Sequence, residues 1–162
     1  MNQITVRNAC ASDSPLLRAL AAACGTLDVH TPYTYWVACR YHSKSIFILE
    51  DSGTPVGYIM ALDNPDCVFL WQIGILSSHR GKGLSKLLYA RVMDFAAAAE
   101  KPLQVTIAPE NKASYGAMEN YCRSRGLTIQ AEDTLHLNDC IDREFQETEI
   151  IYTVFPAERS SL

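Results

Sequence analysis

The residues best suited to bind a ligand follow one another in the stretch Arg80 to Gly83, which reads Arg-Gly-Lys-Gly. Two glycines at the start of a helix let the backbone adopt positive φ angles and direct several N–H groups toward one point. The helix N-terminus adds partial positive charge there, and Arg80, Lys82 and Lys86 add formal charge. The stretch is therefore predicted to bind an anion such as a phosphate group.

A second concentration of reactive groups lies in the connection LDVHTPYTYW, which ends at Trp36. It holds a carboxylate (Asp28), an imidazole (His30) and three aromatic rings. One interpretation is structural: Thr31 caps the next helix, proline takes its first position, and the rings pack beneath it. The other is a binding pocket. We favour the pocket for Asp28 and Tyr33, and both interpretations stay open for Trp36.

The elements that must position the glycine loop lie on either side of it. Val68 to Leu76 is an almost unbroken apolar run, rich in β-branched and aromatic residues and too short for a globular helix, so it predicts a buried strand. Gly74 inside this strand indicates a bulge or the close approach of a ligand. After the loop, apolar residues recur at steps of three and four, which predicts an amphipathic helix. Its inward residues are predicted to be Leu84, Leu87, Leu88, Val92 and Phe95.

The rest of the chain predicts further strands and helices. Other strands are predicted over residues 4–7, 45–50, 55–62, 103–108, 127–131 and 149–155. One helix is stopped by Gly25, one is capped by Thr31, and one runs from the cap Asn111 to Arg125, whereas residues 132–147 are predicted to be irregular. The order β-α-α-β-β-β-α-β-α-β-β predicts one α/β domain of the α+β type over residues 1–162, with a mixed central sheet flanked by helices.

Length and composition exclude several classes of protein. A chain of 162 residues that is 48% hydrophobic can form one globular domain with a core. No signal-peptide pattern is present and no apolar run reaches about 18 residues, so we expect a soluble cytoplasmic protein without a membrane partner. A net charge of -4 argues against a nucleic-acid partner and is compatible with a cationic substrate. The six scattered cysteines predict reduced thiols, and the isolated histidines predict no metal site.

The string RGKGLS (residues 80–85) resembles the Arg-x-x-Gly-x-Gly/Ala loop with which the GNAT family of N-acetyltransferases binds coenzyme A; Ser85 in the last small-residue position is a departure. The P-loop and Rossmann fingerprints are absent. The resemblance implies the GNAT acyl-CoA N-acyltransferase fold, acetyl-CoA as co-substrate, and a splayed central strand that binds the pantetheine arm. The coenzyme-binding residues that it implies are Ile73, Ile75, Arg80, Gly81, Lys82, Gly83, Leu84, Ser85, Asn111 and Ser114.

Four separated segments resemble, in order, the diaminobutyrate acetyltransferases of ectoine biosynthesis. They are LDVHTPYTY (27–35), WQIGI with RGKGL (71–84), TIAPENKAS (106–114) and ETEIIY (147–152). Such enzymes transfer acetyl from acetyl-CoA to the 4-amino group of L-2,4-diaminobutyrate. The resemblance implies that Asp28, Tyr33, Trp71 and Glu149 bind this substrate, with His30 in the same pocket, and that Asp28, Glu149 and Tyr33 act in catalysis. It also implies a role in osmoprotection and a homodimer.

Two positions depart from that family's pattern. Gln146 stands where a histidine is usual, and His30 where an asparagine is usual. Another small diamine, an amino acid or a polyamine therefore stays open as the acceptor. An aminoglycoside or a protein N-terminus is a further alternative, although the aromatic-rich segment argues for a small closed pocket. A non-catalytic acyl-CoA sensor is disfavoured because both Asp28 and Glu149 are present.

Acetyl transfer to an alkylammonium requires two proton movements. The ammonium, with a pKa near about 10, must lose a proton before it attacks the thioester. Asp28 and Glu149 are the candidate bases, unless one of them only holds the other ammonium. Many GNAT enzymes protonate the departing thiolate with a tyrosine, but that position is Met118, and nearby Tyr115 either replaces it or is inert. Because no residue suggests an acyl-enzyme, we predict direct attack in a ternary complex.

Overall fold

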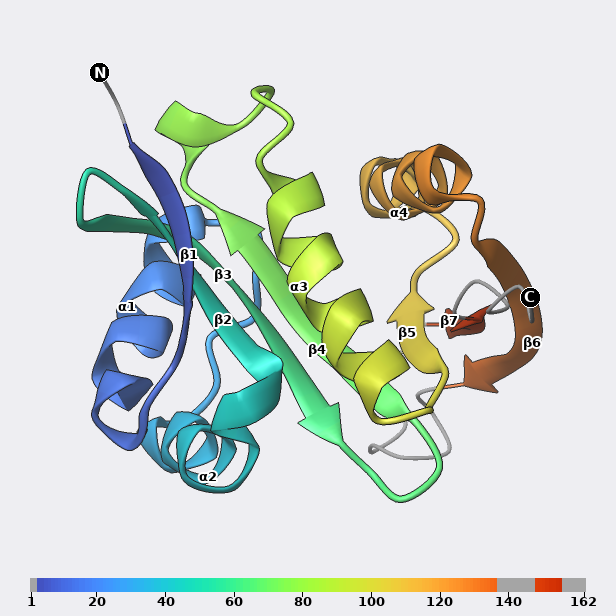
Figure 1. Ribbon diagram of the computed structural model, residues 1–162, viewed down its shortest axis with the longest axis horizontal. Coiled ribbons are helices and arrows are strands. Elements are labelled where there is room, and N and C mark those ends of the chain that lie inside the picture. Colours follow the sequence, from blue (N-terminus) through green and yellow to red (C-terminus); the bar gives the residue numbers. More distant parts are fainter. Residues whose placement is uncertain (1–2, 137–147, 156–162) are drawn as a thin grey trace.

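Seven strands form one mixed sheet in the computed structural model, which describes residues 3–136 and 148–155 (Figure 1). The strands are β1 (Ile4–Asn8), β2 (Ile46–Asp51), β3 (Thr54–Asp63), β4 (Val68–Ile75), β5 (Leu103–Ile107), β6 (Thr128–His136) and β7 (Thr148–Phe155). They lie in the order β1-β2-β3-β4-β5-β7-β6. The β4–β5 pair is parallel and the other described pairs are antiparallel, which confirms the predicted mixed sheet.

In the described part of the chain, four α-helices cover the two faces of the sheet. They are α1 (Ser14–Cys24), α2 (Pro32–His42), α3 (Ser85–Ala98) and α4 (Lys112–Arg125), and single 3-10 turns lie at Ala11–Asp13, Ser43–Ser45 and Ser77–His79. The larger core lies beneath α3 and α4, and a smaller one lies between α1, α2 and the opposite face (Figure 1). No helix in the described part is long and apolar enough to span a bilayer.

The helix boundaries follow the predicted caps. The Thr31 hydroxyl accepts a hydrogen bond from the Thr34 amide at 3.3 Å, and the Asn111 side chain accepts one from the Ser114 amide at 3.2 Å. Gly25, with φ 70°, ends α1 in the left-handed conformation that favours glycine. These local signals fix where the connections leave the helices.

Two predictions about secondary structure were wrong. Residues from Glu132 to His136 are not irregular, because they continue β6, an edge strand whose polar side chains face solvent along much of its length. Leu87 is 43% exposed rather than inward, and the face of α3 that is buried includes Tyr89 and Met93. The helix is rotated because it packs against α4 as well as the sheet, and the Tyr89 ring lies 5.5 Å from the Tyr121 ring of α4.

A bulge in β4 reverses the direction of its side chains. Met60 of β3 pairs with Gln72 and Ala61 pairs with Leu70, so Trp71 is an extra residue with no partner in this ladder. Leu70 lies in the core beneath α3 and α4, whereas Gln72 bonds to side chains on the α1 and α2 side. Side chains of a strand normally alternate between its two faces, and an extra residue shifts this alternation by one position. Leu70 and Gln72 therefore face opposite sides of the sheet although they are two residues apart.

Gly74 does not mark this bulge, which lies at Trp71. A Cβ on Gly74 would come within 2.6 Å of Leu27 Cδ1 and 2.9 Å of Cys24 Sγ. The glycine is therefore required by the close approach of the chain after α1 to the strand, and it lets the segment that carries Asp28 lie against β4.

β4 and β5 part after a short parallel ladder. Their pairing covers only Val68 to Leu70 with Leu103 to Val105, although β5 continues along β7 as far as Ile107. The splay that the family resemblance implied is thus present. Beyond Leu70, the edge of β4 that faces β5 is left without a strand partner (Figure 1).

The described cysteines are free thiols, in agreement with the prediction. Burial raises the pKa of Cys39 and of Cys122 to about 11, so both remain protonated and act as small apolar core residues. Cys140 lies outside the described residues.

Candidate functional site

A cavity of about 450 Å³ occupies the space where β4 and β5 part. We call it the splay cavity. Its walls come from the segment after α1, from the strands β4, β5, β6 and β7, and from the helices α3 and α4. Segments far apart in the sequence therefore converge at the splay.

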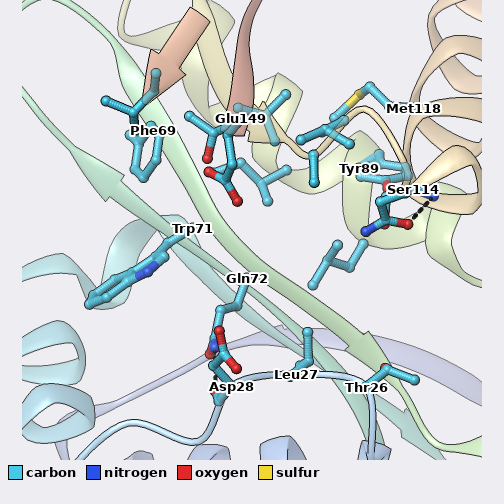
Figure 2. Close-up of a pocket in the computed structure, with 18 of the residues that line it drawn as sticks. Thr26, Leu27, Asp28, Phe69, Trp71, Gln72, Tyr89, Ser114, Met118 and Glu149 are labelled. Carbon is cyan, nitrogen blue, oxygen red and sulfur yellow. Dashed lines mark hydrogen bonds between the residues drawn. The ribbon is translucent and has the colours of Figure 1, made fainter. Parts of the chain in front are cut away.

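Two carboxylates enter the splay cavity from opposite walls. Figure 2 shows Asp28 on one side and Glu149 on the other, with the Trp71 indole at the edge between them. His30 also lines the cavity, and its ring centroid lies 4.8 Å from that of Trp71. Two anionic groups and an aromatic face attract a cationic ligand through Coulomb and cation–π interactions.

A buried polar network fixes the wall that carries Asp28. The Gln72 side-chain amide donates to the Asp28 carbonyl oxygen at 2.8 Å. Its Oε1 accepts from the hydroxyl groups of Tyr58 at 2.7 Å and Tyr35 at 3.2 Å. Burial raises the pKa of Tyr58, so this hydroxyl stays protonated and keeps donating. Gln72 was not predicted as a site residue, but a lone amide in an otherwise apolar strand was the signal that could have identified it.

Replacing Gln72 with leucine is expected to raise the KM for the acceptor about 10-fold, because the Asp28 loop loses its anchor. The free energy of unfolding should also fall by about 1–3 kcal/mol, since two buried hydroxyls lose their acceptor. Tyr58→Phe is the matched control, because it weakens the same network and leaves the bond from Gln72 to Asp28. Steady-state kinetics and thermal unfolding measure both effects. An equal change of KM in the two variants would show that the anchor is unimportant.

A second cavity, of about 220 Å³, lies over the glycine loop, and we call it the loop cavity. Most of the predicted coenzyme residues line it: Ile73, Ile75, Arg80, Gly81, Gly83, Leu84, Ser85 and Ser114. Gly81 and Gly83 have φ angles of 73° and 72°, and a Cβ built on either would meet no described atom within 4 Å. The loop backbone thus borders open space at the N-terminus of α3, which is where an anion is expected.

The remaining predicted coenzyme residues are placed differently. Asn111 lines the splay cavity, while its side-chain oxygen caps α4. Lys82 is exposed and lines neither cavity in the described part of the chain. Arg80 borders the loop cavity, but its guanidinium donates to the carbonyl oxygens of Ile75, at 2.9 Å, and Cys24. It therefore ties the loop to the end of α1.

The two cavities adjoin each other. Thr26, Ile73, Tyr89 and Ser114 line both, so these residues mark the junction. A ligand held by its phosphate in the loop cavity could extend past this junction and present a reactive group to a second ligand between Asp28 and Glu149.

Some predicted residues are not brought to the junction. Tyr33 is 71% exposed and stacks on Trp36, with ring centroids 5.8 Å apart, so its role in catalysis or substrate binding stays a prediction. Tyr115 donates to Glu119 at 3.4 Å and packs on Tyr152, away from the described walls of both cavities. Met118 does line the splay cavity. Gln146 lies outside the described residues.

Two of the described histidine side chains have protein partners. His42 Nδ1 accepts from the Asp63 amide at 3.1 Å, and His79 Nε2 lies 3.1 Å from Asp51 Oδ2. The hydrogen bond from His79 lowers the pKa of Asp51. Among residues 3–136 and 148–155, no three His, Cys, Asp or Glu side chains gather as metal ligands.

A mixed sheet that parts beside a glycine loop at a helix N-terminus is the architecture of an acyl-CoA-dependent N-acyltransferase, and solved structures of this class share the fold. The ribosomal-protein-S18-alanine N-acetyltransferase from Escherichia coli superposes with a TM-score of 0.78 over 99% of both chains, at 14% identity. Residues 15–131 match the Acetyltransferase (GNAT) family. The chain belongs to this family and is an acetyltransferase.

More specific similarities are to one group of enzymes. The L-2,4-diaminobutyric acid acetyltransferase of Halalkalibacterium halodurans is 30% identical over 135 residues, 81% of this chain and 71% of that protein. The Streptomyces coelicolor enzyme of the same name is 29% identical over 154 residues, 90% and 88% of the two chains. The diaminobutyrate acetyltransferase from Paenibacillus lautus, solved with L-2,4-diaminobutyric acid and coenzyme A, superposes with a TM-score of 0.84 at 26% identity, covering 96% of both chains.

Proposed function

We propose that this protein transfers acetyl from acetyl-CoA to the 4-amino group of L-2,4-diaminobutyrate. The observation that carries the proposal is the pair of carboxylates, Asp28 and Glu149, on opposite walls of a cavity that adjoins the glycine loop. Diaminobutyrate has two ammonium groups, so a cavity with two separated anionic groups suits it better than it suits a monoamine. The similarity to enzymes named for this substrate supports the same assignment.

The coenzyme is assigned to the loop cavity. Its pyrophosphate would accept hydrogen bonds from the backbone N–H groups of Gly81, Gly83 and their neighbours at the N-terminus of α3. Its pantetheine arm would run along the part of β4 that lacks a partner strand, from Ile75 toward Ile73. The thioester then arrives at the junction of the two cavities.

The acceptor is assigned to the splay cavity. One ammonium of diaminobutyrate would bind one carboxylate, and the other carboxylate would orient the 4-amino group and take up its proton directly or through water. The faces of Trp71 and Phe69 line the same cavity and add apolar and cation–π contacts. The amine then attacks the carbonyl carbon of the thioester, the C–N bond forms, and the C–S bond breaks to release coenzyme A.

A free-thiol assay across a panel of amines tests this assignment. We expect L-2,4-diaminobutyrate to have the highest kcat/KM when compared with 2,3-diaminopropionate, ornithine, putrescine and a monoamine of similar length. The rate should rise between about pH 7 and 9 as the amine loses its proton. If the protein acetylates the monoamine and not diaminobutyrate, the proposed substrate is wrong. The proposed use of acetyl-CoA would be unaffected by that result.

We also propose that the protein is a cytoplasmic homodimer that serves osmoprotection. The exposed aromatic side chains of α2, which include Tyr33, Trp36 and Tyr41, support an association that would cover them. Sedimentation at micromolar concentration should give twice the 18.0 kDa mass of one chain. A species of 18.0 kDa alone would refute the dimer.

A further inference from the structure

Tyr89 stands at the junction of the two cavities, and no part of the predicted chemistry used it. It lies in α3, lines both the splay cavity and the loop cavity, and is 3% exposed. Figure 2 shows it on the same wall as Ser114, across the cavity from Trp71. No sequence motif singles it out, because a tyrosine in an amphipathic helix is usually a core residue.

The hydroxyl of Tyr89 is available to a ligand. Within the described part of the chain, no residue hydrogen-bonds it, yet that part also contains no fully buried polar side-chain atom without a partner. The hydroxyl must therefore keep a small accessible surface, and the cavities are the space that the residue lines. The Tyr89 ring packs on the Tyr121 ring, with ring centroids 5.5 Å apart, and this packing sets its orientation.

The side chains nearby are less suited to contact a sulfur leaving group. Met118 has no hydrogen to donate, and Tyr115 is directed at Glu119 and Tyr152. Thr26 and Ser114 have aliphatic hydroxyls, which are weaker acids and donors than a phenol, and Thr26 is exposed to competing water. The buried phenol is the donor whose hydrogen bond gains most from the low local dielectric.

We propose that the Tyr89 hydroxyl donates a hydrogen bond to the sulfur of the coenzyme and stabilises the thiolate as the thioester breaks. The nitrogen of the acceptor forms the new bond to the carbonyl carbon, and the electron pair of the C–S bond passes to sulfur. The ammonium proton leaves to a cavity carboxylate or to water, and the thiolate takes its proton from solvent. Of the proposed function, this inference needs only the part that places coenzyme A in the loop cavity; it does not depend on the identity of the acceptor.

Tyr89 keeps its own proton throughout. Burial raises the pKa of Tyr89 to about 12, well above the value near about 8.5 of an ordinary thiol. Full transfer from the phenol to the thiolate would thus be disfavoured by roughly a thousandfold or more. A charge-assisted hydrogen bond stabilises the thiolate without this proton transfer. It therefore takes the place of the tyrosine that donates a proton in many GNAT enzymes, whose position is Met118 here.

The experiment is a titration of the coenzyme A thiol on the enzyme, followed by thiolate absorbance against pH with no acceptor present. Donation to the thiolate lowers the pKa of the bound thiol, so Tyr89→Phe should raise that pKa by about one unit relative to the parent protein. Tyr121→Phe removes the same atom from a neighbouring buried tyrosine and should not change it. Ser114→Ala removes the competing hydroxyl from the junction and should shift the pKa by less than Tyr89→Phe does. In turnover, Tyr89→Phe should lower kcat about 10- to 100-fold with both KM values nearly unchanged.

Three results would overturn the proposal. The first is an unchanged thiol pKa and kcat in Tyr89→Phe, and the second is an equal shift in Ser114→Ala. The third is a loss of more than about 5 °C in melting temperature, which would show that the hydroxyl has a structural partner. Because the titration uses coenzyme A alone, its outcome is independent of whether diaminobutyrate is the acceptor.

Discussion

Asp28→Asn and Glu149→Gln are each expected to lower kcat/KM for L-2,4-diaminobutyrate by about 10- to 1000-fold. Each change keeps the shape of the side chain and removes its charge from a wall of the splay cavity. A charge-assisted contact is worth about 1.5–3 kcal/mol. The variant that lacks the general base also loses the acceleration from proton removal, so its kcat/KM should fall further. Steady-state kinetics at fixed, saturating acetyl-CoA measures the effect.

Two controls separate the acceptor from the fold and from the coenzyme. Asp66→Asn removes an exposed carboxylate that precedes β4 and lines neither cavity, and it should leave kcat/KM unchanged. The affinity for acetyl-CoA should be the same in all these variants, because the loop cavity includes neither Asp28 nor Glu149. If both cavity variants acetylate diaminobutyrate at the parent rate, the assignment of the pocket is wrong.

Gly83→Val is expected to weaken acetyl-CoA binding by more than about 100-fold. Gly83 has φ 72° and borders open space in the loop cavity, so a β-branched side chain would occupy the position assigned to the pyrophosphate. It would also strain the backbone by about 1–3 kcal/mol. Calorimetric titration with acetyl-CoA measures the change in affinity.

Gly126→Val is the matched control for that strain. Gly126 has φ 65° at the end of α4, and a Cβ there also meets no described atom within 4 Å, but it lines neither cavity. Both variants should lose similar stability, while only the change at Gly83 should abolish coenzyme binding. Equal acetyl-CoA affinity in the two would place the coenzyme elsewhere.

Local signals in the sequence were sufficient for most of the architecture. The caps at Thr31 and Asn111, the glycine after α1 and the apolar run of β4 each act over a few residues, so the order and ends of the elements could be predicted. The end of β6 could not, because Glu132 to His136 is polar and its strand conformation depends on pairing with β7.

Some residues of the candidate site could be predicted from the sequence, and others could not. Asp28, Trp71 and Glu149 were assigned to one pocket through a resemblance, and they do line one cavity. Gln72 and Tyr89 were missed because their roles depend on tertiary geometry. The bulge at Trp71 turns Gln72 toward the Asp28 loop, and the rotation of α3 turns Tyr89 toward the junction. The rotation leaves no pattern in the amino-acid sequence, and the signal left by the register shift is the lone amide of Gln72 in an otherwise apolar strand.

The most direct test of the proposed chemistry is a crystal structure of this protein with coenzyme A and L-2,4-diaminobutyrate. It should show the two ammonium groups within hydrogen-bond distance, about 3 Å, of Asp28 and Glu149, with the coenzyme sulfur at the junction beside the 4-amino group. A complex in which the amino acid binds outside the splay cavity, or in which neither carboxylate contacts an ammonium, would contradict the account.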